Sequence, residues 1–458
     1  MFFLSLSTGL IAGCDRPVAS QDLSHAAKHL LDWLGTVIAT RGTKANVQFG
    51  EVVGASAGAV STLRTAGDAP EKAAFALGAL GSLLEMDDLD RTSILHAGDT
   101  VCPAALCAAL ETNCSGPLLL TSLLKGYEIS IRIGRTAARG GYTTWYNSSA
   151  CGVFGAAMAA SCAKGLTTLQ SAHALGHAGM QASGLWQARL EPGFAKQMAT
   201  AHAARAGISA ARAAEAGLAA PLEILEGNLG FFKTFFPEAE VASVLSTHST
   251  SWLLHQVSLK PWSACRHTHP AIAAALDLQS TLKDLTLLRD ILVVTYGPAI
   301  SFCDRPDPQN AHEARFSLQH CVALALYKGA PERADFEEPA RRNVPALVAL
   351  REKITLSEDP EYTQAFPVAY PATVEATDQN GHRISVHAPH APGDPEAPLT
   401  DAEVTQKFVA NCHDGGIPPE VATALQAAVR HLPDASDLSG LRRALNEIPM
   451  STKARTYA

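Results

Sequence analysis

The chain has 458 residues, a formal net charge of −8, 47% hydrophobic residues and only 17% charged residues. This length and this apolar content are enough for two or three domains, each with its own core. The sequence contains no basic run and no pattern of stacked basic and aromatic residues. It therefore argues against nucleic acid and against an anionic membrane surface as partners.

The first residues form a short apolar run, and Ile11-Ala12-Gly13-Cys14 looks like the cleavage box of a bacterial lipoprotein. No Lys or Arg precedes this box, so the positive region of a signal peptide is missing. We therefore interpret the segment as the first helix of a cytoplasmic protein, with lipoprotein processing as the alternative. No apolar run reaches the ~20 residues that a helix needs to cross a bilayer.

Residues 20–84 predict helices, because apolar residues recur there at helical spacing, as in Leu23, Ala27, Leu30, Leu31 and Leu34. Further helices are expected at 103–111, 118–133, 152–166, 168–179, 199–207 and 210–217. The helix at 152–166 consists almost wholly of small residues, which predicts a core helix packed closely against its neighbours. Residues 86–101 are polar and rich in turn-forming residues.

The character of the chain changes near residue 285, where three strands are predicted, at 290–296, 366–376 and 383–387. The last two flank Asn380-Gly381, which is typical of a tight hairpin turn. Helices are expected at 311–326 and 339–354, and again at 400–410, 418–431 and 436–448 after a proline-rich linker. We therefore expect a mainly α protein with a large all-helical domain, residues 1–265 and 400–458, and a smaller α+β lid domain, residues 266–399.

Ten cysteines are scattered along the chain without a C-x-x-C pair and without the spacing of a zinc site. Several lie in alanine-rich helical stretches, where a thiol acts as a small apolar side chain. This usage predicts free thiols in a reducing compartment.

The densest group of reactive side chains is Lys260-Pro261-Trp262-Ser263-Ala264-Cys265-Arg266-His267-Thr268-His269-Pro270. Its two prolines argue against the interior of a long helix. Two fixed cations, a thiol and two imidazoles indicate a segment that binds carboxylates and moves protons. Arg266 offers a planar fork for a carboxylate. A solvated loop around a buried Trp262 is the alternative.

Three other segments hold candidate reacting groups. Asp88, Thr92 and His96 are spaced by four residues, so a helix there would present all three on one face, and a carboxylate beside an imidazole makes a general base. Capping of the following helix is the alternative. Tyr146 precedes the small-residue helix, whose N-terminus suits a carboxylate, although an aromatic plug explains it equally well. Lys196 lies in apolar sequence, where desolvation tunes an ammonium group for catalysis unless the side chain extends to solvent.

The order of these segments resembles the MmgE/PrpD family, which includes 2-methylcitrate dehydratase, cis-aconitate decarboxylase and iminodisuccinate epimerase. The matching motifs are Asp88-x-Asp90-x-Thr92, His96-Ala97-Gly98, Gly126-Tyr127-Glu128, Gly152-x-Phe154-Gly155-Ala156-Ala157, Lys196, Ala203-Ala204-x-x-Gly207, Pro221-x-x-Ile224-Leu225-Glu226-Gly227-x-x-Gly230-Phe231, Lys260-Pro261-Trp262, Cys265-Arg266-x-Thr268-His269-Pro270 and Glu313-Ala314-x-Phe316-Ser317. The resemblance implies a homodimer without a metal or other cofactor, a helical domain with an α+β lid, and an active site between the two domains.

The resemblance also implies a pocket that holds Asp88, Thr92, His96, Lys196 and Lys260. Two positions differ from the decarboxylase members of the family. Tyr146 and Cys265 stand where those members have histidines, and the histidine at the position of Cys265 is catalytic in them. Both differences argue against decarboxylation of cis-aconitate.

We expect an acid–base enzyme that removes a proton from the carbon beside a carboxylate of a small di- or tricarboxylic acid. The candidate catalytic residues are His96, Lys196, Tyr146 and Asp88, and the candidate substrate-binding residues are Thr92, Lys260, Arg266, His269 and Cys265. Elimination of water, as in a dehydratase, is the preferred reaction. Epimerisation of a dicarboxylate such as iminodisuccinate, and a helical scaffold without activity, are the alternatives.

Overall fold

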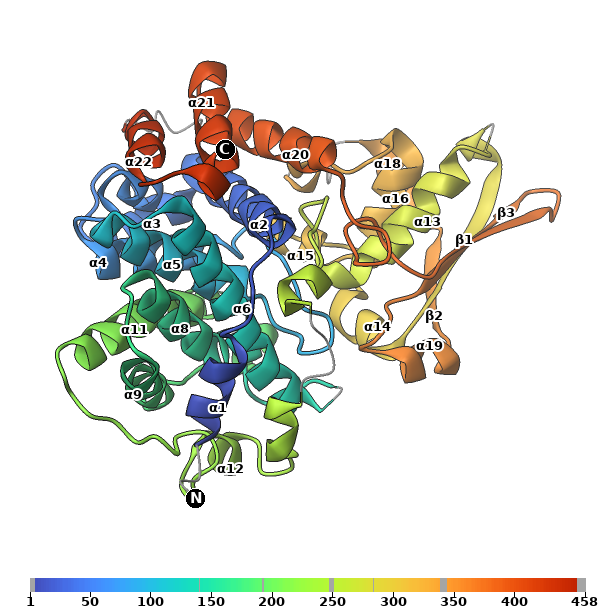
Figure 1. The fold of residues 1–458 in the computed structure, drawn as a ribbon. Coiled ribbons are helices and arrows are strands. Elements are labelled where there is room, and N and C mark those ends of the chain that lie inside the picture. Colours follow the sequence, from blue (N-terminus) through green and yellow to red (C-terminus); the bar gives the residue numbers. More distant parts are fainter. Residues whose placement is uncertain are drawn as a thin grey trace. The chain divides into compact units, whose positions relative to one another are not determined.

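The computed structural model describes residues 5–139, 141–191, 193–246, 251–282, 284–337 and 344–450. The protein is mainly helical, with 59% helix and 7% strand, which confirms the predicted class. The chain divides into two compact units, which are described separately (Figure 1). Unit 1 comprises residues 1–83, 87–257 and 400–458, and unit 2 comprises residues 84–86 and 258–399. No helix of the described residues is both long enough and apolar enough to span a bilayer.

Unit 1 is built from helices. Its α-helices are α1 (Leu6–Gly13), α2 (Ser20–Ala39), α3 (Lys44–Val52), α4 (Pro70–Leu80), α5 (Gly98–Thr112), α6 (Gly116–Ala138), α7 (Asn147–Ala150), α8 (Gly152–Ala163), α9 (Thr168–Gly179), α10 (Gln187–Leu190), α11 (Ala195–Glu215), α12 (Phe231–Phe235), α20 (Asp401–Asp414), α21 (Pro419–Arg430) and α22 (Ser439–Asn446). Its 3-10 helices are η1 (Thr40–Gly42), η2 (Ala59–Thr65), η3 (Val241–Leu245), η4 (Leu253–Gln256) and η8 (Leu432–Asp434).

The small-residue helix α8 lies at the centre of unit 1, packed against α5, α6, α9 and α11 (Figure 1). The absence of side chains allows α6 and α8 to come very close. A Cβ built on Gly155 would lie 2.5 Å from the carbonyl oxygen of Gly126, and one built on Gly126 would lie 2.9 Å from the carbonyl oxygen of Gly155. This confirms the predicted core helix, because only small residues permit such an approach.

One expectation for unit 1 was wrong. Residues 199–215 belong to one helix, α11, rather than to the two helices expected at 199–207 and 210–217. The segment that carries Asp88, Thr92 and His96 is not helical: Asp90 and Leu95 form an isolated β-bridge, and Ile94 between them has a positive φ of 51°. The three residues therefore do not share a helix face, and the helix that follows begins at Gly98 rather than at Pro103.

Unit 2 contains a four-stranded sheet with helices. The strands are β1 (Leu288–Thr295), β2 (Ile354–Glu358), β3 (Ala372–Asp378) and β4 (Arg383–Ala388). The α-helices are α13 (His269–Gln279), α14 (Gly297–Cys303), α15 (Ala311–Arg315), α16 (Leu318–Lys328), α18 (Pro345–Arg351) and α19 (Pro360–Ala365), and the 3-10 helices are η5 (Arg266–Thr268), η6 (Leu285–Leu287) and η7 (Arg333–Phe336). The strand order is β2-β1-β3-β4, with β1 and β2 parallel and the other pairs antiparallel. Helix α13 packs against β3 and β4.

The sheet contains the three predicted strands and one that was missed. The hairpin of β3 and β4 turns at residues 379–382, as Asn380-Gly381 predicted. β3 begins only at Ala372, because Pro371 and Pro367 lack the N–H group that a strand donates. The helix expected at 339–354 is α18, and the missed strand β2 begins at Ile354, the last residue of that range. Residues 339–343 lie outside the described residues.

Replacing Gly155 with alanine should destabilise unit 1, because the new methyl group would overlap the carbonyl oxygen of Gly126. Overpacking of this kind typically costs about 1–3 kcal/mol. The matched control is Gly440→Ala in α22, where nothing lies within 4 Å of the new methyl group, and a gain of about 0.5–1 kcal/mol is expected. Urea unfolding followed by circular dichroism measures both changes. An unchanged midpoint in Gly155→Ala would show that α6 and α8 can separate without cost.

Candidate active site

His96 lies beside two acidic residues of the segment that precedes α5. The bridge between Asp90 and Leu95 folds this segment back on itself, so His96 meets the start of the segment. Its Nδ1 is 2.8 Å from Oδ2 of Asp87 and 2.6 Å from the carbonyl oxygen of Asp88. Both neighbours are acceptors, so Nδ1 carries the hydrogen. Nε2 has no partner among the described residues, and in the neutral imidazole it is the basic nitrogen.

The spacing of four residues had suggested that the Asp88 carboxylate contacts His96. In the structure, the carboxylate beside His96 is that of Asp87. Asp88 is occupied elsewhere. Its Oδ2 accepts hydrogen bonds from the Tyr127 hydroxyl (2.6 Å) and from Nδ1–H of His29 (3.3 Å), and its Oδ1 accepts from the backbone N–H of Gly98 (3.0 Å). Gly98 is the first residue of α5, where a helix favours a negative charge. Asp88 thus joins α2, α5 and α6.

The imidazoles of His29, His25 and His255 form a row that extends from Asp88 to Asp22 in the first turn of α2. The ring centroids of His29 and His25 are 4.9 Å apart, and those of His25 and His255 are 4.3 Å apart. Nε2 of His255 lies 2.7 Å from Oδ1 of Asp22. Burial lowers the pKa of His25 to about 2, and the two neighbouring histidines add to this effect. The middle imidazole is therefore neutral in the folded protein over the ordinary pH range.

Asp99, in the first turn of α5, has a strongly raised pKa. Its side chain is fully buried, and burial together with the charge of Asp87 raises its pKa well above the usual value, whereas the Lys196 ammonium opposes the shift. The two residues that interact with it flank the site from different elements, since Asp87 precedes α5 and Lys196 lies on α11. Burial and the neighbouring acids thus hold the pKa of the Asp99 carboxyl group well above its usual range.

Lys196 and Tyr146 complete the group of predicted catalytic residues in unit 1. Tyr146 is only 1% exposed and packs against Trp186. Burial raises its pKa, and the charge of Lys196 opposes this shift, so the phenol stays protonated. Lys196 is half-buried in the first turn of α11, where the helix dipole disfavours a cation. Its positive charge acts on both Asp99 and Tyr146, and its catalytic role stays a prediction.

Thr92 lies in the turn between Asp90 and Leu95 and is half-buried. Its predicted role in substrate binding therefore cannot rest on a helix face shared with His96. The role stays a prediction.

The remaining predicted residues belong to unit 2. Lys260 is fully buried, with Nζ 3.5 Å from Oε2 of Glu85. Burial alone would raise the pKa of the Cys265 thiol, but a hydrogen bond from Cys303 and the charge of Lys260 leave that pKa below its usual value. The structure thus brings a cation and an ionisable thiol together in this unit, and their role in substrate binding stays a prediction.

Arg266 and His269 are held by partners of their own unit. Arg266 forms a buried ion pair with Asp394, and Nε2 of His269 donates to the carbonyl oxygen of Ala264 at 3.1 Å. Asp394 is also the buried member of a group with His390 and Glu396, the one cluster of possible metal ligands found among the described residues. The buried carboxylate of this group, that of Asp394, is thus already paired with Arg266.

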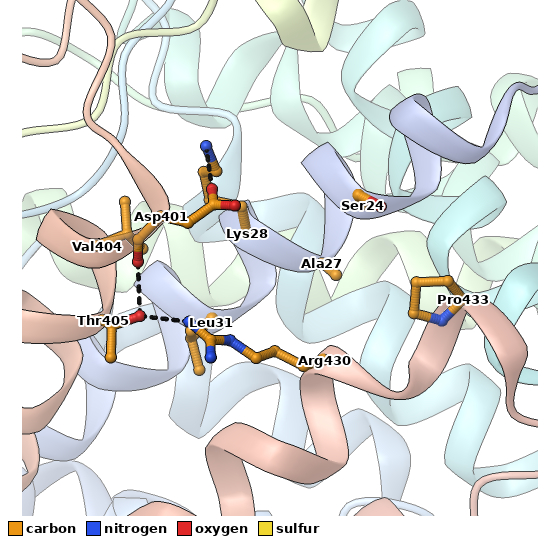
Figure 2. Close-up of a pocket in the computed structure, with 9 residues that line it drawn as sticks. All are labelled: Ser24, Ala27, Lys28, Leu31, Asp401, Val404, Thr405, Arg430 and Pro433. Carbon is orange, nitrogen blue, oxygen red and sulfur yellow. Dashed lines mark hydrogen bonds and ion pairs between the residues drawn. The ribbon is translucent and has the colours of Figure 1, made fainter.

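A pocket of about 200 Å³ opens elsewhere in unit 1, between α2, α20 and α21 (Figure 2). It is lined by Ser24, Ala27, Lys28, Leu31, Asp401, Val404, Thr405, Arg430 and Pro433. Figure 2 shows that its two cations point at pocket residues: Nζ of Lys28 lies 2.6 Å from Asp401, and Arg430 donates to Thr405 at 2.6 Å. None of the predicted site residues lines this pocket, and its cations are already engaged.

Sequence reasoning missed Asp87, Asp99 and Tyr127. Asp87 stands directly before Asp88, and its relation to His96 depends on the bridged loop. Asp99 was visible only as an acid at the start of an alanine-rich stretch, which is an ordinary position for a surface helix residue. Tyr127 belongs to the motif Gly126-Tyr127-Glu128, but nothing in the motif indicates that its hydroxyl bonds Asp88.

Both halves of the chain match models of known protein families. The MmgE/PrpD N-terminal domain matches residues 16–243, and the MmgE/PrpD C-terminal domain matches residues 262–432. The chain belongs to the MmgE/PrpD family. The family resemblance inferred from the ordered motifs is thereby confirmed.

Three relatives are similar to this MmgE/PrpD chain over most of its length. The cis-aconitate decarboxylase of Homo sapiens is 28% identical, with 81% of this chain and 78% of the relative covered. That of Mus musculus is 27% identical, with 82% and 78% covered. The cis-aconitate decarboxylase-like protein oryM of Aspergillus oryzae is 25% identical, with 81% of both chains covered. These matches support an enzyme of the MmgE/PrpD type.

The stability of this MmgE/PrpD protein should depend on pH through His25. Below its ordinary pKa of 6.5 the unfolded chain binds a proton at His25, whereas the folded chain does so only near pH 2. Stability is therefore lost as pH falls below 6.5, by up to about 1.4 kcal/mol per pH unit for this one proton. His25→Leu should flatten the fall of the urea midpoint with decreasing pH. The control is His413→Leu, an exposed histidine of α20, which should leave the slope unchanged; equal slopes for all three proteins would contradict the assignment.

Proposed function

We propose that the protein is a lyase of the dehydratase type. It removes a proton from the carbon beside a carboxylate of a small di- or tricarboxylic acid and eliminates water. The MmgE/PrpD family and its decarboxylase relatives support a lyase that acts on a carboxylic acid. The observation that carries the proposal is the geometry of His96. Its Nδ1 is held by Asp87 and Asp88, and Nε2 is without a partner among the described residues.

In this proposal His96 Nε2 takes the proton from the carbon. Negative charge then builds on the adjacent carboxylate, and the Lys196 ammonium stabilises it in a largely buried setting. The electron pair left on the carbon forms a double bond as the hydroxyl group departs from the neighbouring carbon. The hydroxyl takes a proton from an acid of the site and leaves as water. Tyr146 supplies this proton, because its raised pKa keeps the phenol protonated.

Epimerisation is the second candidate, and the place of Tyr146 favours it. Here His96 removes the proton from one face of the carbon, and Tyr146 returns a proton to the opposite face. Two groups whose environments hold them in different protonation states are what such a reaction needs. Elimination is preferred because the similar relatives are lyases by name.

Decarboxylation of cis-aconitate, the activity named for the relatives, has less support in this chain. The family resemblance places Tyr146 and Cys265 where decarboxylase members have histidines. A buried phenol with a raised pKa and a thiol do not reproduce the charge of a protonated imidazole. Decarboxylation of cis-aconitate is therefore treated as one possible outcome of the assay below.

The assay incubates the protein in deuterated water with methylcitrate, citrate, cis-aconitate and iminodisuccinate in turn. New ultraviolet absorbance from a conjugated acid supports elimination. Deuterium at the carbon or inversion of its configuration, without new absorbance, supports epimerisation. Release of carbon dioxide identifies a decarboxylase, and the absence of every change would favour a helical scaffold without activity.

His96→Gln should lower turnover by about 10²–10⁴-fold, because it removes the proposed base while keeping a polar side chain of similar size. The matched control is His382→Gln, whose side chain is 79% exposed in the turn between β3 and β4 and should leave turnover unchanged. Circular dichroism checks that both variants are folded. Turnover of folded His96→Gln at the wild-type rate would remove His96 from the mechanism.

Tyr146→Phe distinguishes the role of the proton donor from that of the base. The variant should lose product formation by about 10²-fold or more, whereas exchange of the substrate proton with deuterated solvent through His96 should continue. Tyr327→Phe, at a 43% exposed position of α16, is the control and should behave as wild type. Product formation at the wild-type rate in Tyr146→Phe would assign the proton transfer to another acid.

A further inference from the structure

The pocket between α2, α20 and α21 lies within unit 1 and shares no residue with the candidate active site (Figure 2). Its wall on α2 consists of residues spaced three and four apart, which share one face of the helix: Ser24, Ala27, Lys28 and Leu31. The other walls come from α20, α21 and η8. Helices normally pack without large voids, so a hollow of about 200 Å³ between packed helices is more than the fold requires.

The pocket is apolar at its inner end and polar at its mouth. Ala27, Leu31 and Val404 are buried, whereas Ser24 and Arg430 are exposed. A dry cavity of about 150 Å³ is known to hold benzene, so the volume here suits a body of roughly six to ten non-hydrogen atoms. The lining therefore matches a small molecule with an apolar body and one polar end.

The mouth of the pocket carries an arginine that pairs with no carboxylate of the described residues. Arg430 donates to the Thr405 hydroxyl at 2.6 Å, and its other neighbour is the side-chain amide of Gln426. Both partners are neutral, and Thr405 donates its own hydrogen to the carbonyl oxygen of Asp401. A guanidinium group has five N–H donors, so at least two remain for a ligand. These contacts orient the guanidinium group without balancing its charge.

The helix dipole explains a cation at the end of α21, where Arg430 is the last residue. It does not explain the direction of the side chain. Figure 2 shows the side chain extending from α21 along the pocket toward Thr405 of α20. The other cation, Lys28, lies 2.6 Å from Asp401, so its charge is balanced. The lining therefore has one positive charge in excess, which matches a ligand with one negative charge.

We propose that this pocket binds a small monocarboxylate with a short apolar body, such as a fatty acid of about five to seven carbons. The carboxylate pairs with the remaining N–H groups of Arg430, and the carbon chain lies against Ala27, Leu31 and Val404. Binding at this pocket does not depend on the proposed function, and its ligand differs in class from the di- or tricarboxylate substrate proposed above.

Hexanoate is the probe, and saturation-transfer nuclear magnetic resonance measures its binding to the full chain. A Kd on the order of 1 mM or lower is expected for a ligand of this size. Hexanol has the chain without the charge, and adipate would carry a second charge into the apolar inner end; each should bind at least about fivefold more weakly. Inorganic phosphate has charge without a chain, and in competition it should displace hexanoate only at concentrations at least about tenfold higher.

Two variants alter the pocket at exposed positions, where folding should be unaffected. Arg430→Gln removes the charge and keeps a polar side chain, and it should weaken hexanoate binding about five- to tenfold. Ser24→Leu fills the mouth of the pocket and should weaken binding by about tenfold or more. Arg443→Gln, at an exposed position of α22, is the matched control and should bind hexanoate as wild type does. His96→Gln should also bind as wild type, because this pocket is not the candidate active site.

Weaker binding in both pocket variants, with wild-type binding in both controls, would support the proposal. Absence of hexanoate binding to the wild-type chain would overturn it, and so would equal binding of hexanol, adipate or phosphate. Wild-type affinity in folded Arg430→Gln would also overturn it. Loss of binding in His96→Gln would place hexanoate in the candidate active site instead. Circular dichroism checks folding, and if one pocket variant does not fold, the other decides.

Discussion

The Asp88 carboxylate accepts hydrogen bonds from groups on three helices, α2, α5 and α6. The geometry of the candidate site depends on these hydrogen bonds. The Tyr127 hydroxyl, the His29 imidazole and the Gly98 N–H group saturate the carboxylate. Hydrogen bonds to a buried charge are each worth about 1.5–3 kcal/mol, so the segment before α5 is firmly held. With Asp88 fixed, the bridged loop sets His96 against Asp87 and against the Asp88 carbonyl group.

The buried acids of unit 1 show how environment separates identical side chains. Asp88 accepts hydrogen bonds from three donors, whereas burial and the charge of Asp87 raise the pKa of Asp99 against the opposing charge of Lys196. Such burial requires close packing, and the small residues of α5 and α8 together with Gly81 and Gly98 provide it. A Cβ on Gly98 would lie 2.9 Å from both Asp88 and Tyr127. The alanine- and glycine-rich core and the polar site are thus parts of one arrangement.

Much of the fold could be predicted because periodicity and turn chemistry act locally. Helix α9 has the bounds that were expected, and the turn at Asn380-Gly381 joins the two predicted strands. β2 was missed because a five-residue strand at the end of a helical pattern has no signal of its own, and its place is set by pairing with β1. The candidate catalytic residues His96, Lys196, Tyr146 and Asp88 were found from residue type and from motif order.

The sequence by itself determined the mainly helical class, the MmgE/PrpD family and the candidate catalytic residues, since these depend on composition, spacing and ordered motifs. Tertiary structure alone decided which carboxylate lies against His96 and which acid has a strongly raised pKa. Three neighbouring aspartates, Asp87, Asp88 and Asp99, are chemically the same in the chain. Only burial and the donors within reach of each oxygen make Asp88 an anchor, set Asp87 against His96 and raise the pKa of Asp99, because the free energy of a buried charge depends on contacts between residues far apart in the sequence.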